Sequence, residues 1–206
     1  MATVLRGTDL KDVEIHYAAK ACALGFVLVA RREKGICAIL FGDTPEALHD
    51  DLRRRFPQAR LIAAGREFAA LTDKVVAFVE KPTVGLDLPL DIEGTAFQKR
   101  VWRALCRIPA GSTASYAEIA KKIGAPKAVR AVANACAANA IAVAIPCHRI
   151  LRSDGALSGY RGGVGRKRFL LEREKAELEH RTQKWKPVLG KIRGSNKMLE
   201  PRTDSS

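Results

Sequence analysis

The spacing of hydrophobic and polar residues divides the chain into a strand-rich first part and a helical second part. Residues 14–42 contain two apolar runs, 25–30 and 36–41, separated by a polar Arg-Glu-Lys-Gly turn, a pattern typical of paired β-strands. Residues 44–55 begin with Thr-Pro-Glu, in which threonine can cap a helix and proline can occupy its first turn. Residues 67–80 place large apolar side chains at helical spacing. The pattern predicts a small α/β unit, in which we find no cluster of catalytic residue types.

The second part has the spacing of short helices joined by tight turns. Thr95 and Ser115 are each followed three residues later by Gln or Glu, the capping-box pattern that satisfies free amides at a helix N-terminus. The first box predicts a helix to about residue 107, and the second predicts a helix over 116–123. A Gly-Ala-Pro turn then leads into a further helix over 127–137. Two helices joined in this way form a helix-turn-helix.

The helix predicted at 127–137 is unusually poor in large polar side chains. Proteins that read the DNA major groove use Asn, Gln or Arg to reach base edges. A helix lined with alanine suits close approach to a narrower groove, with phosphate contacts at its N-terminus. Burial of the helix on both sides would explain the alanines equally well, so the residues alone leave both interpretations open.

A last helix is predicted over residues 166–180, with Glu174 on the same face as Leu170 and Leu171. A carboxylate on an apolar face usually has a partner, because an unpaired buried charge is costly. The chain after Trp185 is basic and rich in turn residues, and we expect it to be disordered.

Composition narrows the class of protein. With 206 residues, 47% of them hydrophobic, the chain can build one large or two small cores. No apolar run approaches the roughly 20 residues that cross a bilayer, and the N-terminus lacks the features of a secretory signal. The five cysteines, Cys22, Cys37, Cys106, Cys136 and Cys147, are scattered and include no CxxC pair. We therefore expect a cytoplasmic protein without disulfides. The spacing of Cys22 and Cys37 with His16 and His49 fits no metal-ligand pattern, so we expect no metal site.

The formal charge of +14, with an isoelectric point near 9.9, favours a polyanionic partner. Solubility alone could explain a basic chain. The excess of Lys and Arg, however, is concentrated over residues 149–193. This clustering favours nucleic acid.

A cysteine and a histidine stand side by side in the sequence Ile-Pro-Cys-His-Arg at residues 145–149. The apolar run 140–145 precedes them and a glycine-rich stretch, 158–163, follows. This arrangement predicts a short buried extended segment that delivers the thiol of Cys147 to the floor of a pocket. A thiol reacts as its thiolate, and a nearby imidazole can generate one near neutral pH. Isolated cysteines are more often small core residues, but these flanking segments favour a reactive thiol.

Several motifs, in the same order along the chain, resemble the O6-alkylguanine-DNA alkyltransferases, also called methylated-DNA–protein-cysteine methyltransferases. The most specific is Ile-Pro-Cys-His-Arg at 145–149. It is supported by Ser-Tyr at 115–116, Pro-Lys-Ala-Val-Arg at 126–130, Asn139, and Ser-Gly-Tyr at 158–160. The chain is most similar to the alkyltransferase half of bacterial adaptive-response (Ada-type) proteins. Those proteins also carry a zinc-binding domain and transcription-factor helices, which this chain lacks, so we expect repair and no transcriptional regulation.

The resemblance covers about residues 17–177 and is strongest over 88–171. It implies an α+β fold. A small ribonuclease-H-like α/β domain without a catalytic role would occupy residues 1–85. A mainly helical, winged-helix-like domain at 90–180 would carry DNA binding and catalysis, and residues 181–206 would form a basic, disordered tail.

The same resemblance implies roles for the reacting groups. Cys147 would be the nucleophile and His148 its base, acting through a bridging water because adjacent side chains of an extended segment point opposite ways. Glu174 would orient His148 and stabilise its charge. Tyr116 would donate a proton to guanine N3, and Asn139 would fix the turn before the active-site segment.

The resemblance also implies a base pocket and a DNA-binding surface. Tyr160 would wall the flipped base and the backbone amide of Arg161 would contact O6. Gly162 stands where some bacterial members carry a bulky tryptophan. Arg130 would fill the space that the flipped nucleotide leaves. Ala128, Ala131 and Ala133 are small and would let the helix approach the minor groove. Lys127 would be a further DNA-contacting residue.

The expected function is therefore DNA repair. The protein would flip out O6-alkylguanine, and also O4-alkylthymine, and transfer the alkyl group irreversibly to Cys147. It would act once, as a monomer on double-stranded DNA, without a cofactor. The principal alternative is a non-catalytic helix-turn-helix regulator, which would not need a Cys-His pair in a pocket. A protein that binds lesions without repairing them would lack the reactive cysteine, and a cysteine hydrolase would give no reason for the helix-turn-helix.

Overall fold

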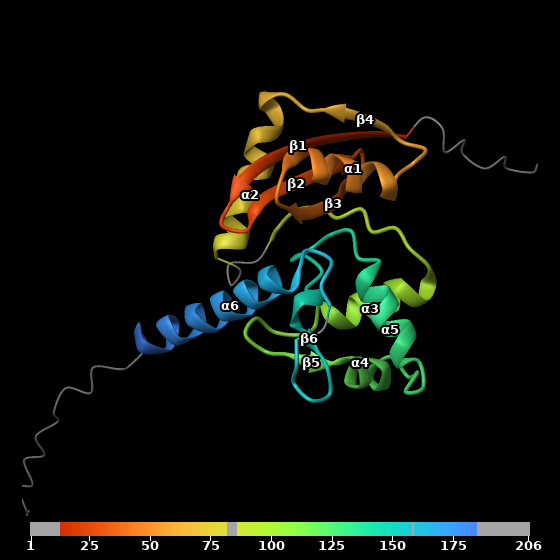
Figure 1. The fold of residues 1–206 in the computed structure, drawn as a ribbon, viewed down its shortest axis with the longest axis vertical. Helices are drawn as coiled ribbons and strands as arrows, with labels where there is room; N and C mark the ends of the chain where they lie inside the picture. The colour runs from red at the N-terminus through yellow and green to blue at the C-terminus, as the bar shows by residue number, and fades with distance from the viewer. Residues whose placement is uncertain (1–12, 82–85, 158, 185–206) are drawn as a thin grey trace, which may run out of the picture.

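A mixed β-sheet forms the first half of the chain (Figure 1). The computed structural model describes residues 13–81, 86–157 and 159–184. The sheet has the strand order β3-β2-β1-β4, with antiparallel β1–β2 and β2–β3 pairs and a parallel β1–β4 pair. Its strands are β1 (Glu14–Cys22), β2 (Gly25–Arg32), β3 (Gly35–Gly42) and β4 (Arg60–Ala63). The strands at 25–30 and 36–41 are thus confirmed, whereas the short strand β4 was not predicted.

Two helices pack on opposite faces of this sheet. Alternate residues of a strand point to opposite faces. Accordingly, α1 (Pro45–Arg55) packs through Leu48 and Leu52 with Leu28 and its neighbours. Helix α2 (Ala69–Glu80) packs through Val75 with the other face. Both predicted helices are confirmed, and Thr44 caps α1 by accepting a hydrogen bond from the amide of Ala47 at 3.2 Å.

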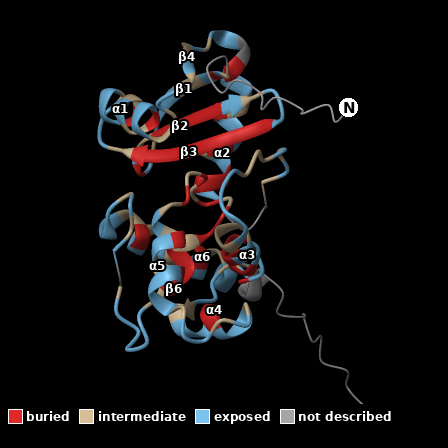
Figure 2. Cartoon of the chain, turned by 90° about the vertical axis from the view of Figure 1, so that its right-hand side faces the viewer, coloured by how far each residue is buried: buried red, intermediate tan, exposed pale blue. Residues whose placement is uncertain are grey.

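The edge strand β3 is covered by the second half of the chain. It is buried along nearly its whole length, as Figure 2 shows. Ile39 donates to the carbonyl of Ala140 at 2.9 Å and accepts from the amide of Ala142 at 3.0 Å. Ile36 makes the corresponding pair of bonds, at 2.8 Å each, with Pro89 and Asp91. An otherwise open sheet edge therefore holds the segment that leads to Cys147.

Short helices form the second half, and both capping boxes are present. Helix α3 (Ala96–Leu105) is capped by Thr95 and Gln98, and α4 (Tyr116–Lys122) by Ser115 and Glu118. Helix α5 (Val129–Ala137) completes the predicted helix-turn-helix. The indole of Trp102 in α3 donates to the carbonyl of Ala135 in α5 at 2.9 Å, which fixes these two helices together.

The helix predicted at 127–137 begins two residues late. The amide of Ala128 donates to the carbonyl of Ala125 at 2.9 Å, closing a turn that contains Pro126. Proline favours the second position of such a turn. Lys127 therefore lies in the turn, and Ala128 is the residue that precedes the helix.

The chain ends its described part with α6 (Val164–Lys184), which projects from the body of the protein (Figure 1). The helix is longer at both ends than the predicted 166–180. A short parallel pair, β5 (Ala114–Ser115) with β6 (Ile150–Leu151), contacts the start of α6, where Lys167 donates to the carbonyl of Ile150. The predicted disordered tail after Trp185 lies outside the described residues.

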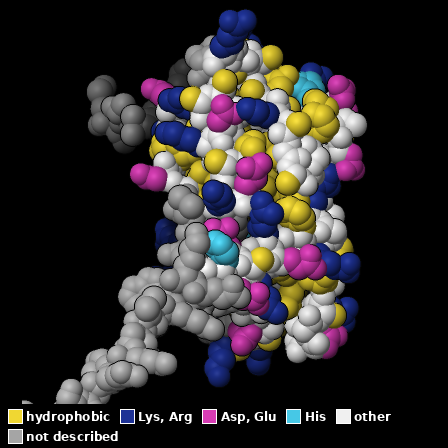
Figure 3. All heavy atoms as spheres, turned by 90° about the vertical axis from the view of Figure 1, so that its left-hand side faces the viewer, with side chains coloured by type: hydrophobic (Ala, Val, Ile, Leu, Met, Phe, Trp, Pro, Cys, Tyr) yellow, Lys and Arg dark blue, Asp and Glu magenta, His cyan; other side chains and the backbone are white. Residues whose placement is uncertain are grey.

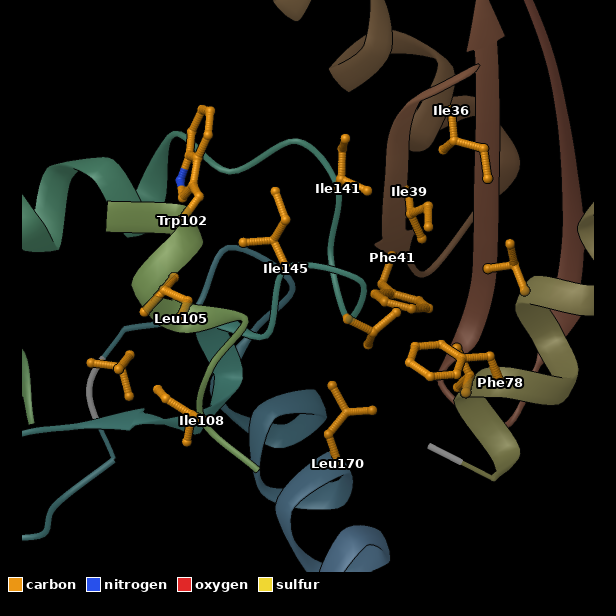
Figure 4. Close-up of a cluster of buried hydrophobic side chains, with 14 of the residues drawn as sticks. Ile36, Ile39, Phe41, Phe78, Trp102, Leu105, Ile108, Ile141, Ile145 and Leu170 are labelled. Atoms are coloured by element: carbon orange, nitrogen blue, oxygen red, sulfur yellow. The ribbon is translucent and has the colours of Figure 1, made fainter. Parts of the chain in front are cut away.

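One core runs through both halves. Figure 4 shows Ile39 and Phe41 of β3 facing Ile141 and Ile145, with Leu170 of α6 below them. These residues are all buried, and they belong to a single contiguous cluster. The predicted α+β class, with a mixed-sheet unit and a helical unit, is confirmed.

Candidate active site

The backbone that carries Cys147 doubles back twice. The amide of Ala144 donates to the carbonyl of Ala142 at 2.7 Å, closing a three-residue turn on Val143. Val143 has a φ of 61°, a left-handed conformation that is rare for a β-branched residue and costs about 1–3 kcal/mol. A second three-residue turn, on Pro146, is closed by a 2.8 Å bond from the Cys147 amide to Ile145.

Asn139 holds both turns and the thiol. Its amide nitrogen Nδ2 donates to the carbonyl of Ile145 at 2.9 Å and to Sγ of Cys147 at 3.2 Å. Its Oδ1 accepts the amide of Ile141 at 2.9 Å. The residue is only 6% exposed, so these bonds are not in competition with bulk water. Asn139 thus fixes where the sulfur lies, a direct contact that the sequence did not predict.

The segment at Cys147 is not extended, and this part of the sequence interpretation was wrong. Residues Cys147–Arg149 form one turn of 3₁₀ helix, η3, in which successive side chains point about 120° apart. Local turn bonds replace the strand pairing that an apolar run suggested. Within the described part of the chain no hydrogen bond joins Cys147 to His148, so any proton path between them would have to be indirect.

His148 and Arg149 share the carboxylate of Glu174, which is fully buried. His148 Nε2 lies 2.8 Å from Oε1, and Arg149 Nη2 donates to the same oxygen at 2.8 Å. The amide of Gly111 donates to Oε2 at 2.8 Å. The carboxylate expected on the apolar face therefore has three partners, and Arg149 is one that the sequence did not predict.

The electrostatics of this group follow from burial and pairing. Burial alone would raise the pKa of Glu174, but the hydrogen bonds from His148 and Arg149 outweigh it and hold the pKa at about 2. Burial lowers the pKa of His148, against the opposing effect of Glu174. Burial raises the pKa of the Cys147 thiol, against the hydrogen bond from Asn139. At neutral pH the group is therefore a neutral thiol, a neutral imidazole and a carboxylate.

A cavity of about 380 Å³ opens in front of the thiol. Both halves of the chain line it. The lining includes Phe41 of β3, Asp51 of α1, Tyr116 of α4, Ala133 of α5 and Cys147 of η3, together with Gly162 of the loop before α6. Tyr116 is the first residue of α4. Tyr160 also lines the cavity, and its hydroxyl is buried without a hydrogen-bond partner among the described residues. Burial raises the pKa of Tyr160 well above its usual value, so it stays a neutral donor.

Helix α5 has one face in solvent, which excludes burial on both sides. Arg130 and Ala131 are exposed, whereas Val132 and Ala135 are buried against the core. Ala133 is half-buried. Of the residues predicted to contact DNA, only Ala133 reaches the cavity lining; Arg130, Ala131, Lys127 and Ala128 lie outside it.

On one face of the molecule, basic side chains are mixed with acidic ones. Figure 3 shows Lys and Arg interspersed with Asp and Glu on the face that includes α6. One lysine is exceptional: Lys167 is 1% exposed and its ammonium group donates to the carbonyl of Ile150. Burial lowers the pKa of Lys167, opposed by Cys147. Lys167 was not predicted from the sequence, although its spacing from Leu170 and Glu174 on one helix face could have revealed it.

Neither a metal centre nor a membrane span is found in the described ranges. Residues 13–81, 86–157 and 159–184 contain no group of three or more His, Cys, Asp or Glu side chains placed to hold a metal ion. Over the same ranges, no helix has the length and apolar character needed to cross a bilayer.

Comparison with known families matches both halves of the chain. Residues 15–92 match the family model described as "6-O-methylguanine DNA methyltransferase, ribonuclease-like domain". Residues 96–176 match "6-O-methylguanine DNA methyltransferase, DNA binding domain".

Relatives and solved structures agree with these matches. The chain is 52% identical over 171 residues to the Escherichia coli "Bifunctional transcriptional activator/DNA repair enzyme Ada", covering 83% of this chain but 48% of that protein. It is 40% identical to a Methanosarcina barkeri "Methylated-DNA--protein-cysteine methyltransferase", covering 80% of this chain and 99% of the relative. The structure of Mycobacterium tuberculosis OGT in complex with DNA superposes with a TM-score of 0.65 at 36% identity, over 79% of this chain and 94% of that one. The chain thus spans about half the length of the adaptive-response relatives.

Proposed function

Because the chain belongs to the 6-O-methylguanine DNA methyltransferase family, we propose that it repairs DNA by transferring the alkyl group of O6-alkylguanine to Sγ of Cys147. The observation that carries the proposal is the placement of that sulfur. The sulfur is held by Asn139 at 3.2 Å and faces a cavity of about 380 Å³. The next residue in the chain is a histidine that is paired with a buried carboxylate. This is the order of nucleophile, base and orienting group that nucleophilic catalysis needs.

The thiol must lose its proton before it can attack. His148 donates through Nε2 to Glu174, which leaves Nδ1 as the acceptor nitrogen. Nδ1 is buried and has no hydrogen-bond partner among the described residues. A water molecule between Sγ and Nδ1 would carry the proton, and the ionised Glu174 would stabilise the imidazolium that forms. Because burial raises the pKa of the thiol, the thiolate would form only when this base is engaged.

The transfer itself is one displacement. A bond forms between Sγ and the alkyl carbon as the bond from that carbon to O6 breaks, and the electron pair stays on the guanine. Tyr116 lines the cavity and would donate a proton to N3 as the ring gains charge, so the base leaves neutral. His148 later returns its proton to solvent and the phenol is reprotonated. The net change is that the alkyl group replaces the thiol proton.

The loop at residues 159–162 would form the other side of the base pocket. Tyr160 and Gly162 line the cavity, and the backbone amide of Arg161 would contact O6. Since Gly162 contributes no side chain, the cavity would accept benzyl as well as methyl groups. O4-alkylthymine, which presents the same alkyl oxygen, would be a second substrate.

Double-stranded DNA would bind at the exposed face of α5. A stacked base cannot reach the cavity, so the nucleotide must flip out at a cost of a few kcal/mol. Arg130 is exposed on that face and would fill the vacated space. Ala128, Ala131 and Ala133 are small enough to let the backbone approach the minor groove, and Lys127 in the preceding turn would contact phosphate.

The product is a thioether, which is stable, so each molecule would act only once. The protein would act as a monomer and would need no cofactor. The test is the intact mass of the protein after incubation with an excess of O6-methylguanine duplex. We expect one added methyl group and then no further change, with the adduct located on Cys147 by fragment sequencing. Cys136 lines the same cavity, which makes Cys136→Ala the matched control: it should still gain one methyl, and Cys147→Ser should gain none. Repeated turnover, or methylation of Cys136, would contradict the mechanism.

A further inference from the structure

We propose that Asp51 and Arg55 of α1 are positioning residues for the transfer, holding the active-site loop at one end and the turn that carries the thiol at the other. The inference rests on the proposed alkyl transfer to Cys147. It assigns a direct role to the first half of the chain, for which the sequence analysis predicted none.

A continuous series of polar contacts runs from the loop to the sulfur. Arg161 Nη2 donates to Oδ1 of Asp51 at 2.9 Å, and Arg55 Nε donates to Oδ2 of Asp51 at 3.1 Å. Arg55 Nη1 then donates to the backbone carbonyl of Asn139 at 3.5 Å, a longer and weaker bond. The side chain of the same Asn139 contacts Cys147 Sγ. Asp51 and Arg161 are 110 residues apart in the sequence, so the contact exists only because the two halves pack together.

Helix α1 is a rigid support for this pair. Leu48 and Leu52 are 2% and 0% exposed and anchor the helix on the sheet. Asp51 and Arg55 are four residues apart, so they share one helix face, turned toward the second half of the chain. The side chains of Arg55 and Asp51 are 10% and 18% exposed, whereas the side chain of Arg161 is 50% exposed. In the contact between Asp51 and Arg161, the helix partner is therefore better shielded from solvent than the loop partner.

A second contact holds the other side of the loop to the same half of the chain. Arg166 donates to the carbonyl of Gly162 at 2.8 Å, to the carbonyl of Leu24 at 2.7 Å and to Asp43 at 2.5 Å. The described loop residues between Gly159 and Gly162, which line the cavity, are thus held to the first half of the chain on both sides. Their distance from the sulfur is set by the packing of the sheet unit against the helical unit.

Arg55 also brings a poorly hydrated positive charge toward the thiol. The titratable and charged groups around Cys147 come from different elements. Lys167 of α6 and Arg55 of α1 act on the pKa of its thiol, and Cys147 in turn acts on Cys136 of α5 and Tyr160 of the loop. Burial raises the pKa of Cys147, while Lys167 and Arg55 lower it. Both cations would therefore stabilise the thiolate as it forms, and Arg55 does so without contacting the sulfur.

The experiment is single-turnover alkylation by O6-methylguanine duplex, in which the transfer rate constant at saturation is separated from the apparent affinity for DNA. The variants are Arg55→Gln, which removes the charge, Arg55→Lys, which keeps the charge but not the planar fork, and Asp51→Asn. The matched control is Arg53→Gln, an exposed arginine on the same helix. Thermal unfolding of every variant separates loss of fold from loss of position.

We expect Arg55→Gln to slow the transfer by about threefold to thirtyfold with little change in DNA affinity, because residues in one contact network couple on this scale. The pH at which its transfer rate rises should also be higher than in the unmodified protein, because the thiolate loses a stabilising cation, and Arg55→Lys should restore most of the original pH profile. Asp51→Asn should slow the transfer. The effects of Asp51→Asn and Arg161→Ala on the transfer rate should not be additive, because both changes break the same contact. Arg53→Gln should match the unmodified protein.

Two results would overturn the inference: an unchanged rate and pH profile in both Arg55→Gln and Asp51→Asn, or equal losses in Arg55→Gln and Arg53→Gln. If Arg55→Gln does not fold, an unchanged transfer rate in Asp51→Asn, or additive effects of Asp51→Asn and Arg161→Ala on that rate, would overturn it instead. Failure of the unmodified protein to alkylate itself would instead contradict the proposed function.

Discussion

Replacing Gly162 with tryptophan tests how the loop shapes the cavity. Gly162 lines the cavity, and its φ lies outside the left-handed region, unlike that of Gly163 at 91°. A side chain at position 162 therefore causes no backbone strain. It does create a steric problem, because a Cβ there would lie 2.8 Å from Cε1 of Tyr160 and 3.3 Å from Cδ1. Tyr160, or the loop, must move even for alanine, and tryptophan additionally fills part of the cavity.

The magnitude follows from the apolar surface that the benzyl ring would lose. Burying a ring of phenylalanine size is worth about 1.5–3 kcal/mol. Its exclusion should therefore lower reactivity toward benzyl by about tenfold to 150-fold. A methyl group needs little space beyond the sulfur, so its transfer should fall much less.

The assay compares second-order rate constants for free O6-benzylguanine and for O6-methylguanine in duplex DNA. The observable is the ratio of the two constants in the unmodified protein and in Gly162→Trp. Gly165→Trp is the matched control, because a Cβ at Gly165 meets nothing within 4 Å and the residue lies outside the cavity lining. Gly162→Ala should give an intermediate ratio, since it displaces Tyr160 without filling the cavity.

An unchanged ratio in Gly162→Trp would show that position 162 does not shape the cavity. An equal fall in both rate constants would contradict the prediction too, because displacement of Tyr160 would then be a general disruption and not a change in pocket size. A ratio that changes as much in Gly165→Trp would show that the assay reports general disruption near the loop and not the size of the cavity.

Two further predictions concern DNA and acid. Arg130→Ala should slow repair of duplex DNA far more than reaction with free O6-benzylguanine, because a free base needs no flipping; equal losses on both substrates would make Arg130 structural. Acid unfolding should report Glu174, whose pKa is about 2 in the folded protein against 4.5 ordinarily. A lowered carboxyl pKa stabilises the fold above pH 4.5, and this stabilisation disappears as the pH falls toward 2. Between pH 5 and pH 2 the free energy of unfolding of the unmodified protein should fall by about 3 kcal/mol more than that of Glu174→Gln. Glu172→Gln, exposed on the same helix, should keep the unmodified pH dependence, and an equal pH dependence in Glu174→Gln would refute the assignment.

The sequence by itself determined the parts of this protein that depend on neighbours within a few residues. Thr95 and Ser115 cap their helices with partners three residues away, and both boxes are present. Thr44 does the same for α1. The apolar face that includes Leu170 also placed Glu174 correctly in the interior. Such contacts form in any chain that adopts the local structure, so the pattern of residue types is sufficient to predict them.

The course of the segment before Cys147 could not be predicted in this way. The apolar run at 140–145 indicated an extended segment, yet Val143 adopts a left-handed conformation that local preference opposes. Only the edge of β3, about a hundred residues earlier, supplies the hydrogen bonds through Ile39 that hold Ala140 and Ala142 in place. Long-range pairing therefore overrides local propensity.

Spacing along the chain did not indicate which charges meet: the family resemblance implied the pairing of Glu174 with His148, and the other pairs appeared only in the tertiary structure. Asp51 contacts Arg161 across 110 residues, and Glu174 is shared between His148 and Arg149, 26 and 25 residues away. Charged residues are common along this chain, and nothing in their spacing distinguishes these partners from the many that remain in solvent. Packing within the second half of the chain removes Glu174, His148 and Arg149 from water, and each then requires the others, because an unpaired buried charge costs more than the fold can supply. Packing of the sheet unit against the helical unit brings Asp51 to Arg161, whose side chain stays half exposed.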